Sequence, residues 1–198
     1  MKIFLIRHGE TTGDVEDRYG GDYDDELSSN GKIEAKELAQ KLKARGIQAI
    51  FYSPRKRAKQ TVEIVNKELK VKTFEVNDLR ERNNYGILTG LTKSEAKQKF
   101  PKEVEELTKY KFLHKLKGTE DYDSFKKRVI NAFEKIINSK DFGTIAIISH
   151  GGPIYMLVRE VLKLGEFKRL GNCAILTIEK QNNKLKLIKL ENAELEKQ

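Results

Sequence analysis

The sequence predicts an α/β fold built on a mostly parallel central sheet. Residues 3–6 and 145–148 are two uninterrupted apolar runs, which is typical of strands buried in a sheet. Segments with the helical spacing of apolar residues separate such runs along the chain. Strands that alternate with helices in this way indicate the α/β class.

The first half of the chain predicts three strands and two helices. A strand over 2–7 precedes a polar loop over 13–29, which is rich in glycine and aspartate. A helix follows, beginning near Ser28 or Ser29 and ending at Gly46, with apolar residues spaced for one face. Residues 49–52 predict a second strand, and 71–76 a third. Between them, Ser53 before Pro54 is typical of a helix N-cap followed by proline in the first turn.

The second half predicts a charged helical segment over 92–117, interrupted at Pro101, and an amphipathic helix over 125–137. A strand over 144–149 follows, and Pro153 opens another helix. Residues 174–178 and 185–190 predict a final pair of strands, joined as a hairpin around Asn182 and Asn183, before a polar, frayed end. We expect one domain over 1–198, because this length suits one core and no linker or repeat interrupts it.

Composition indicates a highly charged globule. Apolar residues make up 38% of the chain and charged residues 35%, and the net charge is +9. A basic protein can bind nucleic acid, but lysine and glutamate alternate here, as in 102–106, and no dense basic block carries interleaved aromatics. We therefore expect a solvated Lys/Glu surface and no nucleic-acid partner. The positive field should still draw in anionic substrates.

Cellular location is also constrained by pattern. No apolar run approaches the roughly 20 residues of a membrane span. The short apolar run at the N-terminus lacks a cleavage site, so we interpret it as a strand and expect neither a signal peptide nor a membrane partner. The single cysteine, Cys173, excludes an internal disulfide and argues against a metal–thiolate cluster. These features predict a cytoplasmic protein.

Two of the three histidines directly follow predicted strands and directly precede glycine. His8 stands in Arg7-His8-Gly9, and His150 precedes Gly151. Parallel strands that end side by side would bring both imidazoles to the sheet edge where such folds bind ligands. An imidazole can act as nucleophile, base or cation, and an adjacent arginine suits phosphate oxygens. The pattern predicts a phosphate pocket with a histidine nucleophile. The third histidine, His114, matches no motif, and we expect it to be exposed.

Four sequence blocks resemble, in order, those of the histidine phosphatase superfamily, the phosphoglycerate-mutase-like proteins. They are Arg7-His8-Gly9-Glu10-Thr11, then Ser53-Pro54-Arg55-Lys56-Arg57-Ala58-Lys59-Gln60-Thr61, then Leu79-Arg80-Glu81 with Gly86 and Gly90, and finally Ile148-Ser149-His150-Gly151-Gly152. The resemblance implies a mostly parallel central sheet flanked by helices on both faces, with His8 and His150 at the carboxyl ends of its strands.

The same resemblance assigns chemical roles to five residues. His8 becomes a phosphohistidine, which water or another acceptor then discharges. Arg7 and Arg57 grip the phosphoryl oxygens, and His150 donates a hydrogen bond to the same group as an imidazolium. Glu81 protonates the leaving oxygen and later acts as a base. No metal is expected, because arginine and histidine supply the positive charge.

Two glycines complete this interpretation, and one arginine falls outside it. Backbone N–H groups around Gly9 and Gly151 are expected to cradle the phosphate. The spacing from Ser53 selects Arg57 as the phosphate ligand and leaves Arg55 at the surface.

The loop after Glu81 resembles that of the cofactor-dependent mutases, which use 2,3-bisphosphoglycerate. In that alternative Arg82, Tyr85 and Lys93 would contact the substrate carboxylate or second phosphate. Gly20 and Gly21 also keep the mutase spacing from His8.

Other features depart from the mutase pattern. The loop has an extra residue, Asn83 or Asn84, and no arginine lies between Lys93 and Glu120, where mutases carry an Arg-Arg pair in a long insert. Gly13-Asp14 replaces the family's Trp-Asn, and a carboxylate at Asp14 beside a dianionic phosphate would repel it unless Asp14 turned toward a basic residue. Residues 118–129 resemble a block of the short phosphatases. A short lid admits water, which favours hydrolysis over retention of a bisphosphate.

We therefore expect a phosphomonoester hydrolase acting on a small phosphorylated metabolite through phospho-His8. The alternative is a phosphoglycerate mutase, which alone would require 2,3-bisphosphoglycerate as a cofactor. A third interpretation, an inactive basic module that binds nucleic acid, rests on the net charge and on Asp14. The sequence does not name the substrate or set the oligomeric state, although homodimers are common in the family.

Overall fold

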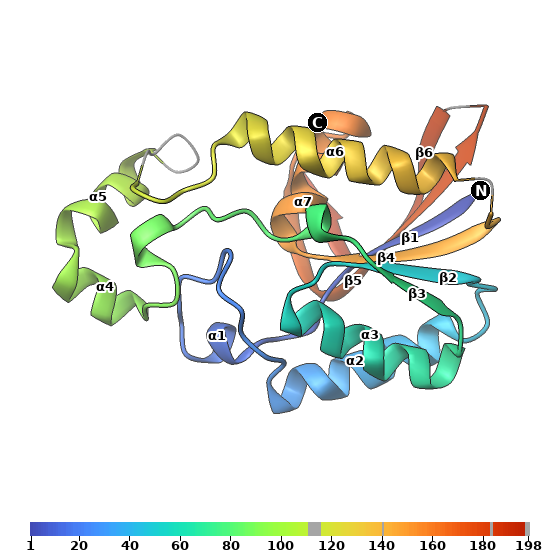
Figure 1. The fold of residues 1–198 in the computed structure, drawn as a ribbon, viewed down its shortest axis with the longest axis horizontal. Helices are drawn as coiled ribbons and strands as arrows, with labels where there is room; N and C mark the ends of the chain where they lie inside the picture. The colour runs from blue at the N-terminus through green and yellow to red at the C-terminus, as the bar shows by residue number, and fades with distance from the viewer. Residues whose placement is uncertain (111–115, 140, 183, 197–198) are drawn as a thin grey trace.

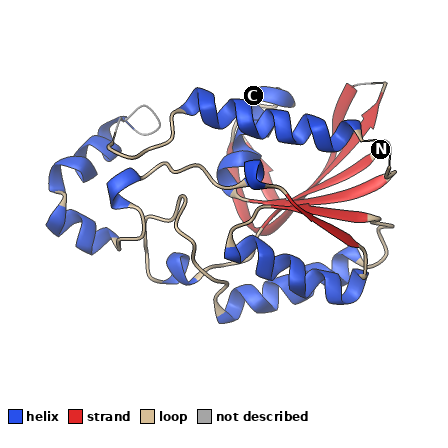
Figure 2. Cartoon of the chain, viewed as in Figure 1, coloured by secondary structure: helices blue, strands red, loops and turns tan. Residues whose placement is uncertain are grey.

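The computed structural model describes residues 1–110, 116–139, 141–182 and 184–196. Its centre is a six-stranded sheet in the order β3-β2-β4-β1-β5-β6, with helices on both faces (Figure 1; Figure 2). The strands are β1 Lys2–Arg7, β2 Ala49–Tyr52, β3 Lys72–Glu75, β4 Thr144–Ser149, β5 Phe167–Gln181 and β6 Lys184–Leu195. Strands β1 to β4 pair in parallel, whereas β5 and β6 are antiparallel, so the predicted α/β class is confirmed.

The helices form two layers and a separate extension. Helices α2 Ser29–Leu42 and α3 Lys56–Leu69 cover one face of the sheet, and α6 Tyr122–Asn138 and α7 Gly151–Met156 cover the other (Figure 1). Helices α4 Lys93–Lys99 and α5 Pro101–Tyr110 lie beyond the carboxyl ends of the parallel strands. Short turns complete the fold at α1 Thr12–Val15, η1 Asn77–Leu79, η2 Gly86–Leu88 and η4 Leu157–Val161.

Alternation along β1 explains why both faces are covered. Phe4 and Ile6 pack with the core residues of α2 and α3, whereas Ile3 and Leu5 pack with those of α6 and α7. All four side chains are at most 3% exposed, because successive residues of a strand point to opposite faces and both faces here meet helices.

The register of β1 against β4 places the two histidines side by side. Arg7 pairs with Ser149 at the end of the ladder, so His8 and His150 are the next residues on adjacent parallel strands. The His8 N–H continues the ladder by donating to the Ser149 carbonyl at 3.0 Å. The predicted meeting of both imidazoles at the carboxyl edge is therefore what the sheet produces.

Several element boundaries differ from the sequence prediction. Ser28 caps α2 through a hydrogen bond from the Gly31 N–H, as expected, but Ser53 is not an N-cap. Helix α3 starts at Lys56 after Arg55, whose side chain makes no cap bond. The one-turn helix α1 overlaps the start of the loop predicted over 13–29. Strands β5 and β6 extend well beyond the predicted apolar runs because their ends pair with each other, so β6 continues through most of the end that was expected to be frayed.

Four expectations fall wholly or partly outside the described residues: the exposure of His114, the part of the predicted helical segment over 111–115, the Asn183 half of the hairpin turn, and residues 197–198 of the predicted frayed end. In the described ranges, no helix is both long enough and apolar enough to span a membrane.

Candidate active site

His8 directly follows β1 and is 5% exposed. Its Nδ1 lies 2.7 Å from the Gly9 carbonyl oxygen, which only accepts, so Nδ1 carries the proton. The lone pair is then on Nε2, which accepts a hydrogen bond from Arg57 Nε at 3.1 Å. Burial, reinforced by Arg57 and Arg7, holds the pKa of His8 well below its ordinary value. The ring is therefore neutral and has the tautomer of an Nε2 nucleophile.

His150 follows β4 and is the fully buried N-cap residue of α7. Its Nδ1 accepts from Arg57 Nε at 3.1 Å, so Nε2 donates to Ser53 Oγ at 2.6 Å. The ring centroids of His150 and His8 are 5.0 Å apart. Burial first, and then Arg57, lowers the pKa of His150 well below its ordinary value. The ring is neutral in the ligand-free protein, in contrast to the imidazolium expected in a phosphate complex.

Two arginines flank the histidines. Arg57, in the first turn of α3, is 4% exposed and shares its Nε–H between both imidazoles. Arg7, the last residue of β1, donates through Nη1 to the Leu170 carbonyl at 2.8 Å. The Nε of Arg7 is buried and has no hydrogen-bond partner among the described residues. A buried guanidinium N–H without an acceptor is suited to an oxygen of a bound anion.

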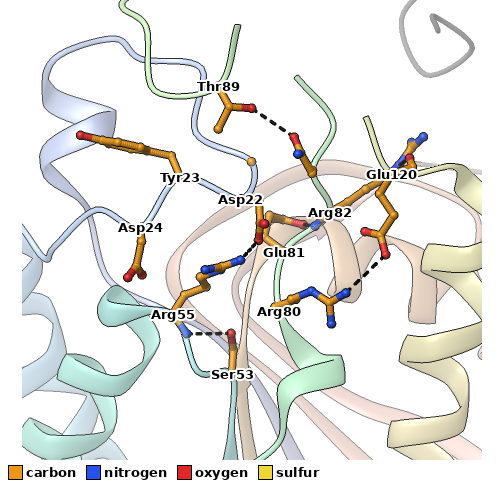
Figure 3. Close-up of polar contacts among 12 residues, drawn as sticks. Asp22, Tyr23, Asp24, Ser53, Arg55, Arg80, Glu81, Arg82, Thr89 and Glu120 are labelled. Carbon is orange, nitrogen blue, oxygen red and sulfur yellow. Dashed lines mark hydrogen bonds and ion pairs between the residues drawn. The ribbon is translucent and has the colours of Figure 1, made fainter. Parts of the chain in front are cut away.

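Glu81 approaches the same edge from the loop after η1. Its carboxylate accepts the Arg82 N–H at 2.8 Å (Figure 3). It also accepts the Gly152 N–H at 2.9 Å. Burial raises the pKa of Glu81 against the opposing effect of these two N–H donors. A raised pKa keeps a carboxyl group protonated at higher pH, as a general acid requires.

A cavity of about 410 Å³ opens beside Arg7 and Glu81, and its lining does not include His8, Arg57 or His150. Six of the predicted site residues line it, namely Arg7, Gly21, Glu81, Arg82, Tyr85 and Gly151. Its far wall comes from α6, α7 and the chain beyond: Tyr122, Phe125, Tyr155, Met156, Arg159 and Glu166. The cavity thus has a cationic end at Arg7 and a mixed aromatic and charged wall.

Four predicted substrate contacts, Gly9, Asp14, Gly20 and Lys93, are absent from this cavity lining. The exposed Asp14 carboxylate accepts the Thr11 N–H at 2.9 Å in the capping box of α1, so it has turned away from the site. Lys93 is exposed and forms an ion pair with Asp17. In the ligand-free protein the Asp14 carboxylate is engaged by the cap of α1 and Lys93 by Asp17, so their substrate contacts stay predictions.

Gly9 has a structural reason to be glycine. A Cβ there would lie 2.7 Å from the Gly31 carbonyl oxygen, so the missing side chain lets α2 pack against the end of β1. The Gly9 N–H donates to Thr61 Oγ1 at 3.4 Å. Its predicted role in a phosphate cradle thus competes with this contact in the ligand-free protein.

Sequence reasoning missed three polar residues around the site. Ser53 accepts the His150 proton, and Asp25 forms a buried ion pair with Arg57 at 2.7 Å. Arg55, expected at the surface, is half-buried and bound to Asp22 (Figure 3). The available signal was an acidic cluster, Asp22, Asp24 and Asp25, and a basic cluster that contains Arg55 and Arg57. Two segments of opposite charge can pair with each other.

Neutral paired imidazoles, two arginines and a carboxyl group of raised pKa, all at one edge of an α/β sheet, define a candidate site for phosphoryl transfer. Residues 3–193 match the family model of the histidine phosphatase superfamily (branch 1). The chain belongs to this superfamily.

Individual relatives include both phosphatases and mutases. The chain is 28% identical over 159 residues to the uncharacterized phosphatase PhoE of Bacillus subtilis, covering 80% of this chain and 76% of that protein. It is 29% identical over 170 residues to the 2,3-bisphosphoglycerate-dependent phosphoglycerate mutase of Parvibaculum lavamentivorans, covering 83% and 81%. Among solved structures, YhfR of Bacillus stearothermophilus matches with a TM-score of 0.83 and 25% identity over 94% of both chains.

Proposed function

We propose that the protein is a phosphomonoester hydrolase that works through a phosphohistidine at His8. The observation that carries the proposal is the tautomer of His8. Its Nδ1–H donates to the Gly9 carbonyl, and its unprotonated Nε2 accepts a hydrogen bond from Arg57. Nε2 of a neutral imidazole is a competent nucleophile, and no further base is needed to prepare it.

The first half-reaction forms a bond between His8 Nε2 and phosphorus while the ester P–O bond breaks. Glu81 delivers its proton to the leaving oxygen, so the alcohol departs neutral. Arg7 and Arg57 neutralise the charge on the phosphoryl oxygens, with His150 as a further donor once the dianion is bound. Because these groups already provide cationic stabilisation, the proposed reaction uses no metal and no cofactor.

The second half-reaction releases inorganic phosphate. Water attacks phosphorus, Glu81 accepts a proton from that water, and His8 leaves with its electron pair restored. The same Glu81 acts first as an acid and then as a base, as microscopic reversibility requires. Burial raises the pKa of Glu81, which favours its protonated form in the first step and its return to that form after the second.

The cavity supports a small substrate with a second anionic group. Arg82 is 8% exposed, and among the described residues its side chain donates one hydrogen bond, from Nε to the Glu120 carbonyl at 3.0 Å. The Glu120 carboxylate is engaged by Arg128 instead, at 2.6 and 2.7 Å. A buried guanidinium without a carboxylate partner is costly unless an anion binds to it. We infer that a carboxylate or second phosphate of the substrate occupies this position.

Mutase activity is the second candidate, favoured by the presence of Arg82 and Tyr85 in the cavity lining. Hydrolysis is preferred because Lys93, the third residue of the mutase-like set, is ion-paired with Asp17 outside that lining. A bisphosphate intermediate would therefore be held by fewer cations.

Phosphorus NMR distinguishes the two activities. The protein is incubated with 3-phosphoglycerate and a trace of 2,3-bisphosphoglycerate, beside a panel of small phosphomonoesters, with the His8→Ala protein as control. Hydrolysis predicts growth of inorganic phosphate without 2-phosphoglycerate. Growth of 2-phosphoglycerate without inorganic phosphate would establish the mutase instead, and no reaction with any ester would reject both.

A further inference from the structure

One loop takes up most of the hydrogen-bonding capacity of Arg57. Its Nη1 donates to Asp25 Oδ1 at 2.7 Å and to the Tyr23 carbonyl at 2.5 Å, and its Nη2 donates to the Gly21 carbonyl at 2.9 Å. The side chains of Arg57 and Asp25 are 5% and 4% exposed. We call residues 21–25 the clamp loop, because they hold the guanidinium from one side.

The clamp fixes which edge of the guanidinium faces the histidines. A guanidinium is a rigid plane, and its Nε–H and one Nη2–H point along the same edge. Asp25 and the Tyr23 carbonyl accept hydrogen bonds from Nη1, whose N–H groups point away from the edge that carries the Nε–H. The Nε–H is then directed at His8 Nε2 and His150 Nδ1, each at 3.1 Å. This is the edge that phosphoryl oxygens would meet when an ester enters.

Gly13 makes room for the Asp25 carboxylate. A Cβ built on Gly13 would lie 2.5 Å from Asp25 Oδ2, which is too close for any side chain. The backbone of Gly13 is helical, so space rather than conformation requires glycine here. The Thr12 N–H donates to the Glu26 carbonyl at 2.9 Å, which holds the two segments together. The departure from the family's tryptophan at position 13 and the buried carboxylate at Asp25 are thus complementary.

We propose that Asp25 is a positioning residue for phosphoryl transfer, and that Gly13 is the position that admits it. Asp25 does not touch the reacting atoms; it acts through Arg57, whose oriented edge serves His8, His150 and the phosphoryl group. The proposal rests on the proposed function for its kinetic consequence, but the orientation of Arg57 is a separate, measurable property of the protein.

The test compares Asp25→Asn, Gly13→Ala and the double variant with the wild type. Asp24→Asn is the matched control, because the exposed Asp24 carboxylate accepts the backbone N–H of Lys56 at 2.8 Å and, among the described residues, has no hydrogen bond to Arg57. For hydrolysis of p-nitrophenyl phosphate, we expect both single variants to lose about tenfold to a hundredfold in kcat, the scale of outer-shell positioning partners, with a smaller change in KM. The control should keep wild-type rates.

The double variant separates coupling from general damage. If Gly13→Ala acts by expelling the Asp25 carboxylate, the double variant will be no slower than the slower single variant. Losses that multiply would overturn the proposal, as would a wild-type kcat in Asp25→Asn. Thermal unfolding of each variant identifies any that fail to fold, and Gly13→Ala, which keeps the ion-pairing groups, still provides the test if Asp25→Asn does not fold.

An imidazole NMR measurement reports on positioning without turnover. Two-bond proton–nitrogen spectra of the wild type should show His8 as the Nδ1–H tautomer with a hydrogen-bonded Nε2. Asp25→Asn should shift the His8 Nε2 and His150 Nδ1 resonances, and Asp24→Asn should not. Unchanged resonances in Asp25→Asn would overturn the positioning role. If the wild type hydrolyses no ester, the proposed function fails while this measurement still decides the role of Asp25.

Discussion

Replacing Gly152 by alanine should remove the general acid without touching Glu81 in the sequence. The added Cβ would lie 2.1 Å from Glu81 Oε1, whereas a carbon–oxygen contact needs roughly 3.3 Å. The carboxylate must therefore move by about 1 Å, and it is held in place by two backbone N–H donors. A displacement of about 1 Å at a reacting group can cost about 100-fold in rate, or about 2.7 kcal/mol.

The assay uses two phosphate esters that differ in their leaving group. An alkyl phosphate needs a proton on its leaving oxygen, whereas p-nitrophenolate departs without one. Gly152→Ala should therefore lower kcat/KM about 100-fold or more for the alkyl ester and much less for the aryl ester.

Gly151→Ala is the matched control, in the same turn of α7. A Cβ at Gly151 would have Glu81 Oε2 no nearer than 3.9 Å, which is ordinary contact. Because its added Cβ leaves Glu81 in place, Gly151→Ala should affect the two esters equally. Equal losses with both esters in Gly152→Ala would refute the assignment of Glu81 as the acid.

Three further predictions follow from burial and charge. In steady-state kinetics, Arg82→Gln should raise KM at least tenfold for phosphomonoesters that carry a carboxylate and leave KM for p-nitrophenyl phosphate unchanged. Lys93→Gln should leave KM unchanged for both kinds of ester. An equal effect of the two variants would contradict the second-anion site. Folding depresses the pKa values of His8 and His150, so below about pH 6.5 the unfolded chain binds protons that the buried rings do not. The contribution of these histidines to the free energy of unfolding should therefore be constant above about pH 6.5 and fall below it, by up to about 1.4 kcal/mol per pH unit per histidine. Urea denaturation across this range checks the sign. Burial raises the pKa of Cys173 to about 12, so iodoacetamide at mildly alkaline pH should alkylate the folded protein far more slowly than the unfolded chain, and equal rates by mass spectrometry would contradict this.

The positions of the two histidines and Arg7 were predictable because each stands in a short contiguous motif at the end of a strand. Arg7-His8 and His150 each end an apolar run, and parallel pairing of two such runs brings their ends together. Glu81 and Arg57 were located through spacing within recognisable blocks. For these residues, strand register and motif spacing are enough to predict that the side chains meet at one edge of the sheet.

The missed residues depend on contacts between segments distant in sequence. Ser53 has the local pattern of an N-cap, yet its hydroxyl is taken by His150, 97 residues away. Asp25 reaches Arg57 only because Gly13 leaves space, which no single segment reveals. Asp14 shows the converse, since a helix cap within three residues engages a side chain that motif spacing assigned to substrate. Lys93 is another long-range case, because its ion-pair partner Asp17 lies 76 residues away.

The most direct test of the account is to trap the phosphoryl enzyme. The protein is mixed with a stoichiometric phosphomonoester substrate, quenched within one turnover, and mapped by mass spectrometry under alkaline conditions that preserve phosphohistidine. The account predicts a phosphoryl group on His8, formed and discharged at rates that match turnover, and neither adduct nor turnover in a folded His8→Ala protein. Turnover without an adduct on His8, or an active His8→Ala protein, would contradict it.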